Sequence, residues 1–477
     1  MCVILHLGIS VQGFCQASIQ PIGSLPATSA DGSPSTSDAM PRMPDLPAKN
    51  SGSQPGAVPT GASFSPITAD QFSPSASQQA APDSNGNSVN VRENLSVADL
   101  PDLDSLSDAS SALMNPNATK EASNRTWRFR PLAGLGYVYD DNIFITHTNT
   151  VSSSLYQIMG GFSFDAGDYR QHKNDYLTLS YLGTGLIYPD LPQINGYDQT
   201  ANLIAQHIFE KLSIVLESFY QYLNGPNRDV GNYVRGTMLS NTLKFIYHKS
   251  SKTSIEIGLN QHSNIYPGNF STYYQEVRLG MDYQLDPRLK IGFQGIIGED
   301  TTQGSPNQDY QTINGRLEYT LTGKLLLKAS AGLQANEFTT GNIPIRLLPV
   351  FSLGSDYHPS QNTMISILGY RNLQSSASLA GQDYIATGFS ISVDHSIHQR
   401  WTPGISIGYE NDTYISNTSN VSTSRVDNYA FIRPHLSYHF LKYLDADVYY
   451  SFKQNNSTYE NYSWKDNQIG VACKTAF

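Results

Sequence analysis

Cysteine, tryptophan and charged residues are all scarce in this chain of 477 residues. It has three cysteines, Cys2, Cys15 and Cys473, which are too few and too widely spaced for a disulfide scaffold or a zinc site. Only 15% of its residues are charged, against about 25% in ordinary globular chains. Runs of about 18 apolar residues are also missing, which excludes a transmembrane helix. Neither a set of soluble enzyme domains nor a helical membrane protein fits this composition.

The chain divides into two parts of different composition. Residues 18–124 hold 11 acidic and 4 basic residues, 13 of the 25 prolines, and two aromatic residues, Phe64 and Phe72. Such a segment cannot bury enough apolar surface to offset its chain entropy, so we predict a disordered acidic tail. A flexible spacer is the simplest role for it, and a periplasmic partner motif or a plug is the alternative.

The remaining part, residues 125–477, is nearly balanced in charge and rich in aromatic residues. It holds 29 acidic and 26 basic residues, together with 49 of the 52 aromatic ones. Without a clustered excess of Lys and Arg, a nucleic-acid partner is not expected. Residues 1–17 form a short apolar segment ending in Cys15-Gln16-Ala17, which predicts a secretory signal peptide, although no Lys or Arg precedes it. The alternative is an ordinary disordered end.

Apolar and polar residues alternate with a period of two from about residue 125 onward. Val277, Leu279 and Met281, for example, alternate with Arg278 and Asp282. Runs of this kind are separated by short turns and by longer polar stretches, such as residues 225–231, 298–307 and 411–427. Alternation over about ten residues is typical of half-buried strands. We therefore predict an all-β fold of about 18 antiparallel strands, with 16–18 as the expected range.

Three features favour a closed transmembrane barrel over a soluble sheet. Tyrosines sit near strand ends, where a membrane interface would lie. The polar face is rich in Gly, Ser, Asn and Gln, which suits a solvated lumen. The chain ends in strand pattern at Phe477, which we interpret as the assembly signal read by the barrel-assembly machinery of a Gram-negative outer membrane. The competing interpretation is a soluble all-β glycan-binding protein that uses its many tyrosines.

Strand parity places a set of charged residues on the polar face, which would line the lumen. A basic ladder could guide an anionic polymer, as in anion-selective pores, whereas a wall of mutually paired charges would carry no selectivity. The predicted lumen-facing residues are Lys244, Glu256, Arg278, Asp282, Lys290, Arg316, Glu318, Lys328 and Arg433.

Two pairs of carboxylates are candidate chemical sites. Asp140 and Asp141 sit at a predicted strand end, where turn chemistry is favoured over calcium binding. Asp445 and Asp447 would face the lumen, where solvated charge is favoured over a general acid/base pair. No histidine lies in a metalloprotease or hydrolase motif. We therefore expect no enzyme activity, no metal site and no cofactor.

Residues 131–146, PLAGLGYVYDDNIFIT, carry a family resemblance. An alternating strand running into Tyr139-Asp140-Asp141-Asn142-Ile143-Phe144 resembles the first strand of the beta-barrel porin 2 family, whose EpsL-like members occur with exopolysaccharide biosynthesis genes. The resemblance implies a porin-like outer-membrane channel that serves export of an exopolysaccharide. Its partners would be outer-membrane lipid and polysaccharide or periplasmic export components. A surface or structural barrel without transport is an alternative with the same fold.

Overall fold

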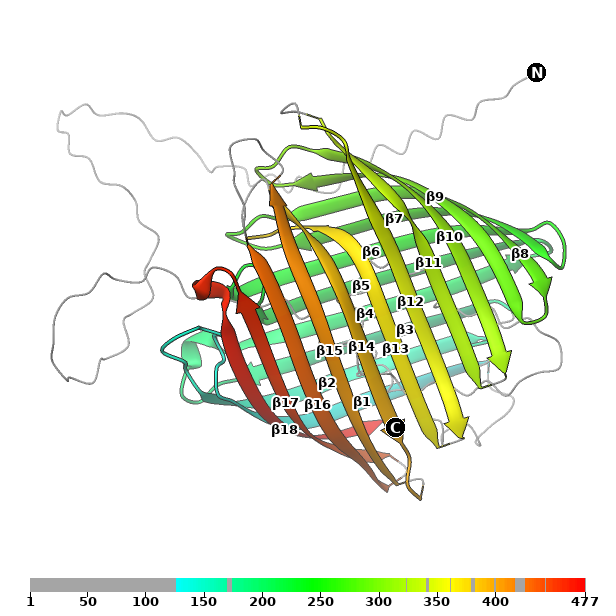
Figure 1. Ribbon diagram of the computed structural model, residues 1–477. Coiled ribbons are helices and arrows are strands. Elements are labelled where there is room, and N and C mark those ends of the chain that lie inside the picture. The colour runs from blue at the N-terminus through cyan, green and yellow to red at the C-terminus, as the bar shows by residue number, and fades with distance from the viewer. Residues whose placement is uncertain are drawn as a thin grey trace, which may run out of the picture. The chain divides into compact units, whose positions relative to one another are not determined.

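The computed structural model describes residues 126–476, apart from 170–173, 323, 340–342, 361, 379–381, 399, 417–424 and 442. The predicted signal peptide (1–17), the predicted acidic tail (18–124) and Phe477 lie outside the described residues. The described part is a single sheet of 18 antiparallel strands that closes on itself (Figure 1).

The strands are long and follow one another without interruption by other structure. Their bounds are β1 Trp127–Asp140, β2 Ser153–Gly167, β3 Tyr176–Ile187, β4 Gly196–Phe209, β5 Leu212–Asn227, β6 Asn232–His248, β7 Thr253–Ile265, β8 Thr272–Asp286, β9 Leu289–Thr302, β10 Gln308–Thr322, β11 Leu325–Phe338, β12 Arg346–Ser360, β13 Thr363–Ser375, β14 Gln382–His395, β15 Trp401–Ser416, β16 Val426–Leu441, β17 Leu444–Ser457 and β18 Trp464–Ala476.

Helical structure in the described ranges is limited to two short 3₁₀ turns, Pro192–Ile194 and Glu460–Tyr462. Neither is long or apolar enough to cross a membrane.

Each strand pairs with its neighbour in sequence, and the last strand pairs with the first. The register of this closing pair runs from Leu132 opposite Ala476 to Asp140 opposite Gln468. Closure leaves no free sheet edge, so the backbone N–H and C=O groups of every strand find partners within the wall. The predicted closed antiparallel barrel of about 18 strands is confirmed.

The barrel has two rims that differ in their connections. Short turns such as that between Asp286 of β8 and Leu289 of β9 gather at the rim where β1 begins and β18 ends; we call this the turn rim. Longer segments gather at the other end, the loop rim. In bacterial barrels the short turns face the periplasm and the longer loops face outward.

Three of the predicted long connections are shorter in the structure. The ladder between β5 and β6 continues to Asn227 opposite Asn232, which leaves residues 228–231 as the turn. β9 extends to Thr302, and β15 extends to Ser416. Those predictions were wrong because we read polar composition as loop. An antiparallel partner satisfies the backbone whatever the side chains are, so strands can continue past the end of the apolar alternation.

Candidate functional site

The outer face of the barrel is apolar and exposed. On β8, Val277, Leu279 and Met281 are 44%, 54% and 51% exposed, and tyrosines Tyr273 and Tyr283 flank them on the same face. A water-soluble protein rarely leaves such a continuous apolar band uncovered. Apolar side chains in the middle with tyrosines at both ends match the hydrocarbon core and the two interfaces of a membrane.

The inner face of the same strand is polar. Glu276, Arg278 and Asp282 alternate with the exposed residues, and Arg278 is only 3% exposed. All nine residues that strand parity assigned to the lumen lie on this inner face, opposite the exposed apolar side chains of their strands. Eight of them stand on the wall from β6 to β11, and Arg433 stands on β16.

Most of these charges lie in ion pairs along the wall. The Lys244 Nζ atom is 2.8 Å from Glu217 Oε1, and the Lys290 Nζ atom is 2.9 Å from Glu318 Oε2. Arg316 donates to both oxygens of Asp282 at 2.9 Å. Because opposite charges are held side by side, this part of the wall presents little net charge toward the lumen.

The remaining predicted residues also have close neighbours. Arg316 lies 3.6 Å from Glu256, and Arg278 pairs with Glu276. Arg433 stacks over the Tyr449 ring at 4.5 Å from its centre. Lys328 is half-buried on the inner face of β11.

Glu217 and Glu276 are partners that the sequence reasoning missed. Glu217 shares the inner face of β5 with Val215 and Phe219, so its parity was a usable signal.

Two glycines allow Arg316 and Asp282 to lie flat against the wall. A Cβ atom at Gly280 would stand 2.7 Å from Nη2 of Arg316, and one at Gly292 would stand 1.9 Å from Oδ1 of Asp282. Glycine in a strand commonly marks such a close approach. The charged side chains therefore cover β8 and β9 instead of projecting across the lumen.

The turn of residues 228–231, between β5 and β6, reaches the opposite wall at the loop rim. β6 and β15 stand nine strands apart in both directions around the ring, and Figure 1 shows them on opposite walls. Nevertheless Arg228 binds Glu410 and Asp412 of β15, and its guanidinium lies 4.6 Å from the centre of the Tyr429 ring. The turn is thus tied across the lumen.

Neighbouring groups hold the same turn in place. Asp229 accepts hydrogen bonds from the Ser376 hydroxyl at 2.8 Å, the Ala377 backbone N–H at 2.6 Å and the Tyr414 hydroxyl at 2.9 Å. Arg425 donates to the carbonyl oxygens of Asp229 and Arg228 at 3.0 and 3.3 Å. These bonds bridge the β5–β6 turn to the β13–β14 connection, to β15 and to the residue that precedes β16.

Both arginines of this cluster remain charged. Burial alone would lower the pKa of Arg228, but the carboxylates of Asp412 and Glu410 outweigh it and raise the pKa well above its usual range. Burial likewise opposes the charge of Arg425, and there the Tyr414 hydroxyl and Asp427 raise the pKa. The guanidinium groups of Arg228 and Arg425 therefore stay protonated where they hold the 228–231 turn.

A second bridge joins the β8–β9 wall to the β13–β14 connection. The Ser375 backbone N–H donates to the Tyr274 hydroxyl at 3.1 Å. The Ser375 hydroxyl shares its one proton between the carboxylates of Asp383, at 3.1 Å, and Asp300. The Phe270 N–H donates to the Ala377 carbonyl at 3.2 Å. Together with the 228–231 turn, this bridge narrows the mouth, which is the loop-rim end of the lumen. Sequence alternation carried no signal for either bridge.

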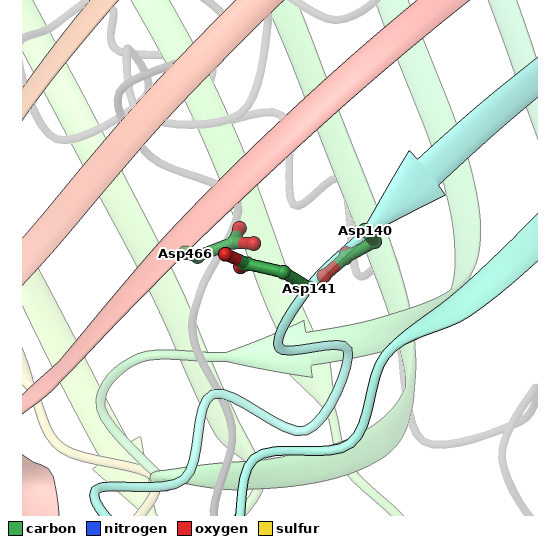
Figure 2. Close-up of side chains that lie close together, drawn as sticks. All are labelled: Asp140, Asp141 and Asp466. Carbon is green, nitrogen blue, oxygen red and sulfur yellow. The ribbon is translucent and has the colours of Figure 1, made fainter.

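Asp140, Asp141 and Asp466 come together at the seam between β1 and β18 (Figure 2). Their nearest oxygens lie within 4.8 Å of one another, a donor set that suits a hard cation. Amide donors engage all three. Asp141 accepts from the Asn467 N–H and side-chain amide, both at 2.7 Å, and Asp140 accepts from Gln468 at 2.8 Å. The Gln468 side-chain amide also donates to Asp466 at 3.1 Å. The contacts fit a clamp on the seam.

The other carboxylate pair also has partners on the lumen wall. Asp445 and Asp447 share the inner face of β17, while Val448 is exposed on the outer face. Asp445 is hydrogen-bonded to His439, and Asp447 lies 3.9 Å from Lys474. These neighbours favour the interpretation of solvated, paired lumen charge.

A closed antiparallel barrel with an apolar exterior and a polar interior defines the class of this protein. Only helices and closed barrels satisfy the backbone within lipid, and barrels of this kind belong to bacterial outer membranes. The chain is a transmembrane β-barrel of a Gram-negative outer membrane. The exposed apolar band excludes the alternative of a soluble all-β glycan-binding protein.

Comparison with known proteins adds a set of distant structural similarities. No family model matches the chain, and no curated relative matches it. Among solved structures, the outer membrane protein opdK from Pseudomonas aeruginosa is similar at 10% identity and a TM-score of 0.37, covering 73% of this chain and 99% of that one. OccAB3 from Acinetobacter baumannii is similar at 12% identity and a TM-score of 0.39, covering 74% and 99%. At these values the similarities assign no function to this chain.

Proposed function

We propose that this protein is a porin-like channel through which small polar or ionic solutes diffuse across the outer membrane. The observation that carries the proposal is the lumen wall, where charged side chains lie in pairs against the strands instead of filling the interior. A packed barrel core would instead hold interdigitated apolar side chains. The proposed role is passive transport without catalysis.

Planar-bilayer recordings test this proposal. The purified barrel, checked by its heat-modifiable gel mobility, should give stepwise conductance in KCl, and boiled protein should give none. Silence from a correctly folded barrel would favour the surface or structural barrel without transport.

A matched pair of glycine variants locates the conducting path. Gly354 faces the lumen from β12 and Gly295 faces outward from β9; a Cβ atom at either position would meet nothing within 4 Å. Gly354→Trp should therefore lower the single-channel conductance, whereas Gly295→Trp adds the same bulk on the lipid side and should leave it unchanged. Equal conductance in the two variants would place the ion path somewhere other than the lumen.

Export of an exopolysaccharide is a narrower proposal, supported by the resemblance of residues 131–146. A polymer would have to pass the bridges at the mouth, so the 228–231 turn and the β13–β14 connection would have to separate during export. Polysaccharide or periplasmic export components are the partners that this proposal implies. Loss of secreted polymer after deletion of the gene, with restoration by the intact chain, would support it; unchanged secretion would overturn it.

A further inference from the structure

One wall of the mouth carries a compact acidic and aromatic pocket. It consists of Tyr370 on β13, Glu410 and Asp412 on β15, and Tyr429 on β16, each at most 5% exposed. The Tyr370 hydroxyl donates to the Glu410 carboxylate and so fixes its orientation. We call these four residues the acidic pocket. All four belong to the same wall, so the pocket does not depend on the 228–231 turn for any of its groups.

The chemistry of the acidic pocket matches a guanidinium group. Two carboxylates offer acceptors to a planar fork of N–H donors, and the Tyr429 ring covers the flat face. A guanidinium uses both features, because it forms in-plane hydrogen bonds and stacks on aromatic rings. An ammonium group is a point charge without a flat face and uses only the charge.

The present occupant is Arg228, and its fit is incomplete. Its Nη2 atom faces Glu410 and Asp412, yet its Nη1 atom is buried without a hydrogen-bond partner among the described residues. The Oδ1 atom of Asp412 is also buried without one. Arg228 is anchored in a four-residue turn between Asn227 and Asn232 that crosses from the opposite wall, so its backbone restricts how the side chain can turn. A guanidinium group free of that tether could orient to use both unsatisfied atoms.

We propose that the acidic pocket is a binding site for guanidinium-bearing cations, occupied in this state by the chain's own Arg228. A tethered group competes at an effective concentration of the order of millimolar for a short flexible link, and the hydrogen bonds that hold the 228–231 turn in place raise it further. A free guanidinium-bearing solute therefore enters only above that range, or when the turn has lifted away. The proposal rests on the proposed function in one respect, since such a solute reaches the pocket through the lumen.

The test removes the tethered occupant and adds a small replacement. Full-length Arg228→Ala, folded in detergent micelles, is heated with methylguanidinium or with methylammonium, and the temperature at which its heat-modifiable mobility changes is measured. Methylguanidinium should raise this temperature at a concentration at least tenfold lower than methylammonium. Adding Glu410→Gln to Arg228→Ala should abolish the preference. Arg235→Ala removes an exposed arginine from β6 and serves as the matched control, which should respond like the unmodified chain.

Each outcome bears on the proposal. Equal shifts with the two cations, or equal responses of Arg228→Ala and Arg235→Ala, would overturn it. If Arg228→Ala does not assemble, Arg228→Lys keeps a positive charge over the carboxylates and should show the same preference with a smaller shift; equal shifts there would overturn the proposal too. Because the readout needs no conductance, a silent bilayer recording with a positive thermal shift would reject the channel and keep the site. Conductance without a thermal shift from methylguanidinium would support the channel and reject the guanidinium site.

Discussion

Replacing Asp141 by alanine tests whether the Asp-Asp-Asn motif acts as a clamp on the barrel seam. The carboxylate of Asp141 accepts two hydrogen bonds from Asn467 of β18, both at 2.7 Å. Hydrogen bonds to a charged group contribute about 1.5–3 kcal/mol each when well buried. Asp141 is only half-buried, so water replaces part of what is lost. We expect Asp141→Ala to lower the free energy of unfolding by about 2 kcal/mol, a value discounted from that range.

A double-mutant cycle with Asn467→Ala isolates this contact. Asn467→Ala removes the side-chain amide and keeps the backbone N–H; it also removes the acceptor for the Tyr450 hydroxyl, a loss that cancels in the cycle. The expected coupling energy is about 1 kcal/mol. The assay is urea unfolding in phospholipid vesicles, followed by tryptophan fluorescence and by heat-modifiable mobility. Asp190→Ala, at an exposed aspartate of the β3–β4 connection, provides the control and should leave the midpoint unchanged.

Chelation of divalent cations distinguishes a hydrogen-bonded clamp from a metal site at the same residues. If amide donors satisfy Asp140 and Asp141, EDTA should leave the urea midpoint of the unmodified barrel unchanged. A coupling energy near zero, with a cost below about 0.5 kcal/mol for Asp141→Ala, would refute the clamp, since that is the range of an ordinary surface substitution. A midpoint that falls with EDTA to that of Asp141→Ala would replace the clamp with a bound cation.

Three further predictions concern other parts of the barrel. Ile145 is 2% exposed against Tyr429 and Trp464 but has a positive φ of 42°. Ile145→Ala should therefore lower the free energy of unfolding in urea by about 2–4 kcal/mol. Ile145→Gly should lower it by no more, because glycine adopts a positive φ without strain. A glycine variant clearly less stable than the alanine variant would show that the backbone of Ile145 is not strained. The Ile208 backbone N–H, with His207, holds the pKa of Asp175 below its usual range. The stabilisation that the Asp175 carboxylate contributes is present above about pH 4 and is lost as the pH falls through its lowered pKa. The urea midpoints of Asp175→Asn and the unmodified chain should therefore differ at pH 7 and coincide in acid. A difference that persists in strong acid would contradict this role of Asp175. Deletion of Phe477 should strongly reduce the amount of barrel in the outer membrane, whereas Phe477→Tyr should be tolerated, and immunoblots of membrane fractions measure both. Normal levels of the deletion variant would show that Phe477 is an ordinary strand end and not an assembly signal.

The amino-acid sequence by itself determined that the barrel wall has an apolar outer face and a polar inner face. A period of two specifies which side chains share a face of a strand, and one apolar face with one polar face is enough to place Val277 outward and Arg278 inward. The same local rule placed Lys244 and Arg316 on the inner face. The number of strands followed because each alternating run is bounded by a recognisable change in composition.

Only the tertiary structure decided what those inner charges meet. Lys244 pairs with Glu217 because the register of β5 and β6 sets the two side chains next to each other. Alternation within one strand does not specify which residue of the neighbouring strand lies opposite. Arg316 reaches Glu256 across two intervening strands because Gly280 and Gly292 leave room above them. The contact between Arg228 and Glu410 joins residues 182 positions apart in the chain. It exists because closing 18 strands into a ring brings β6 and β15 face to face across the lumen and the turn bends inward. Contacts across the lumen depend on the circumference of the barrel and on the direction of its loops, which are properties of the closed barrel and not of any single strand.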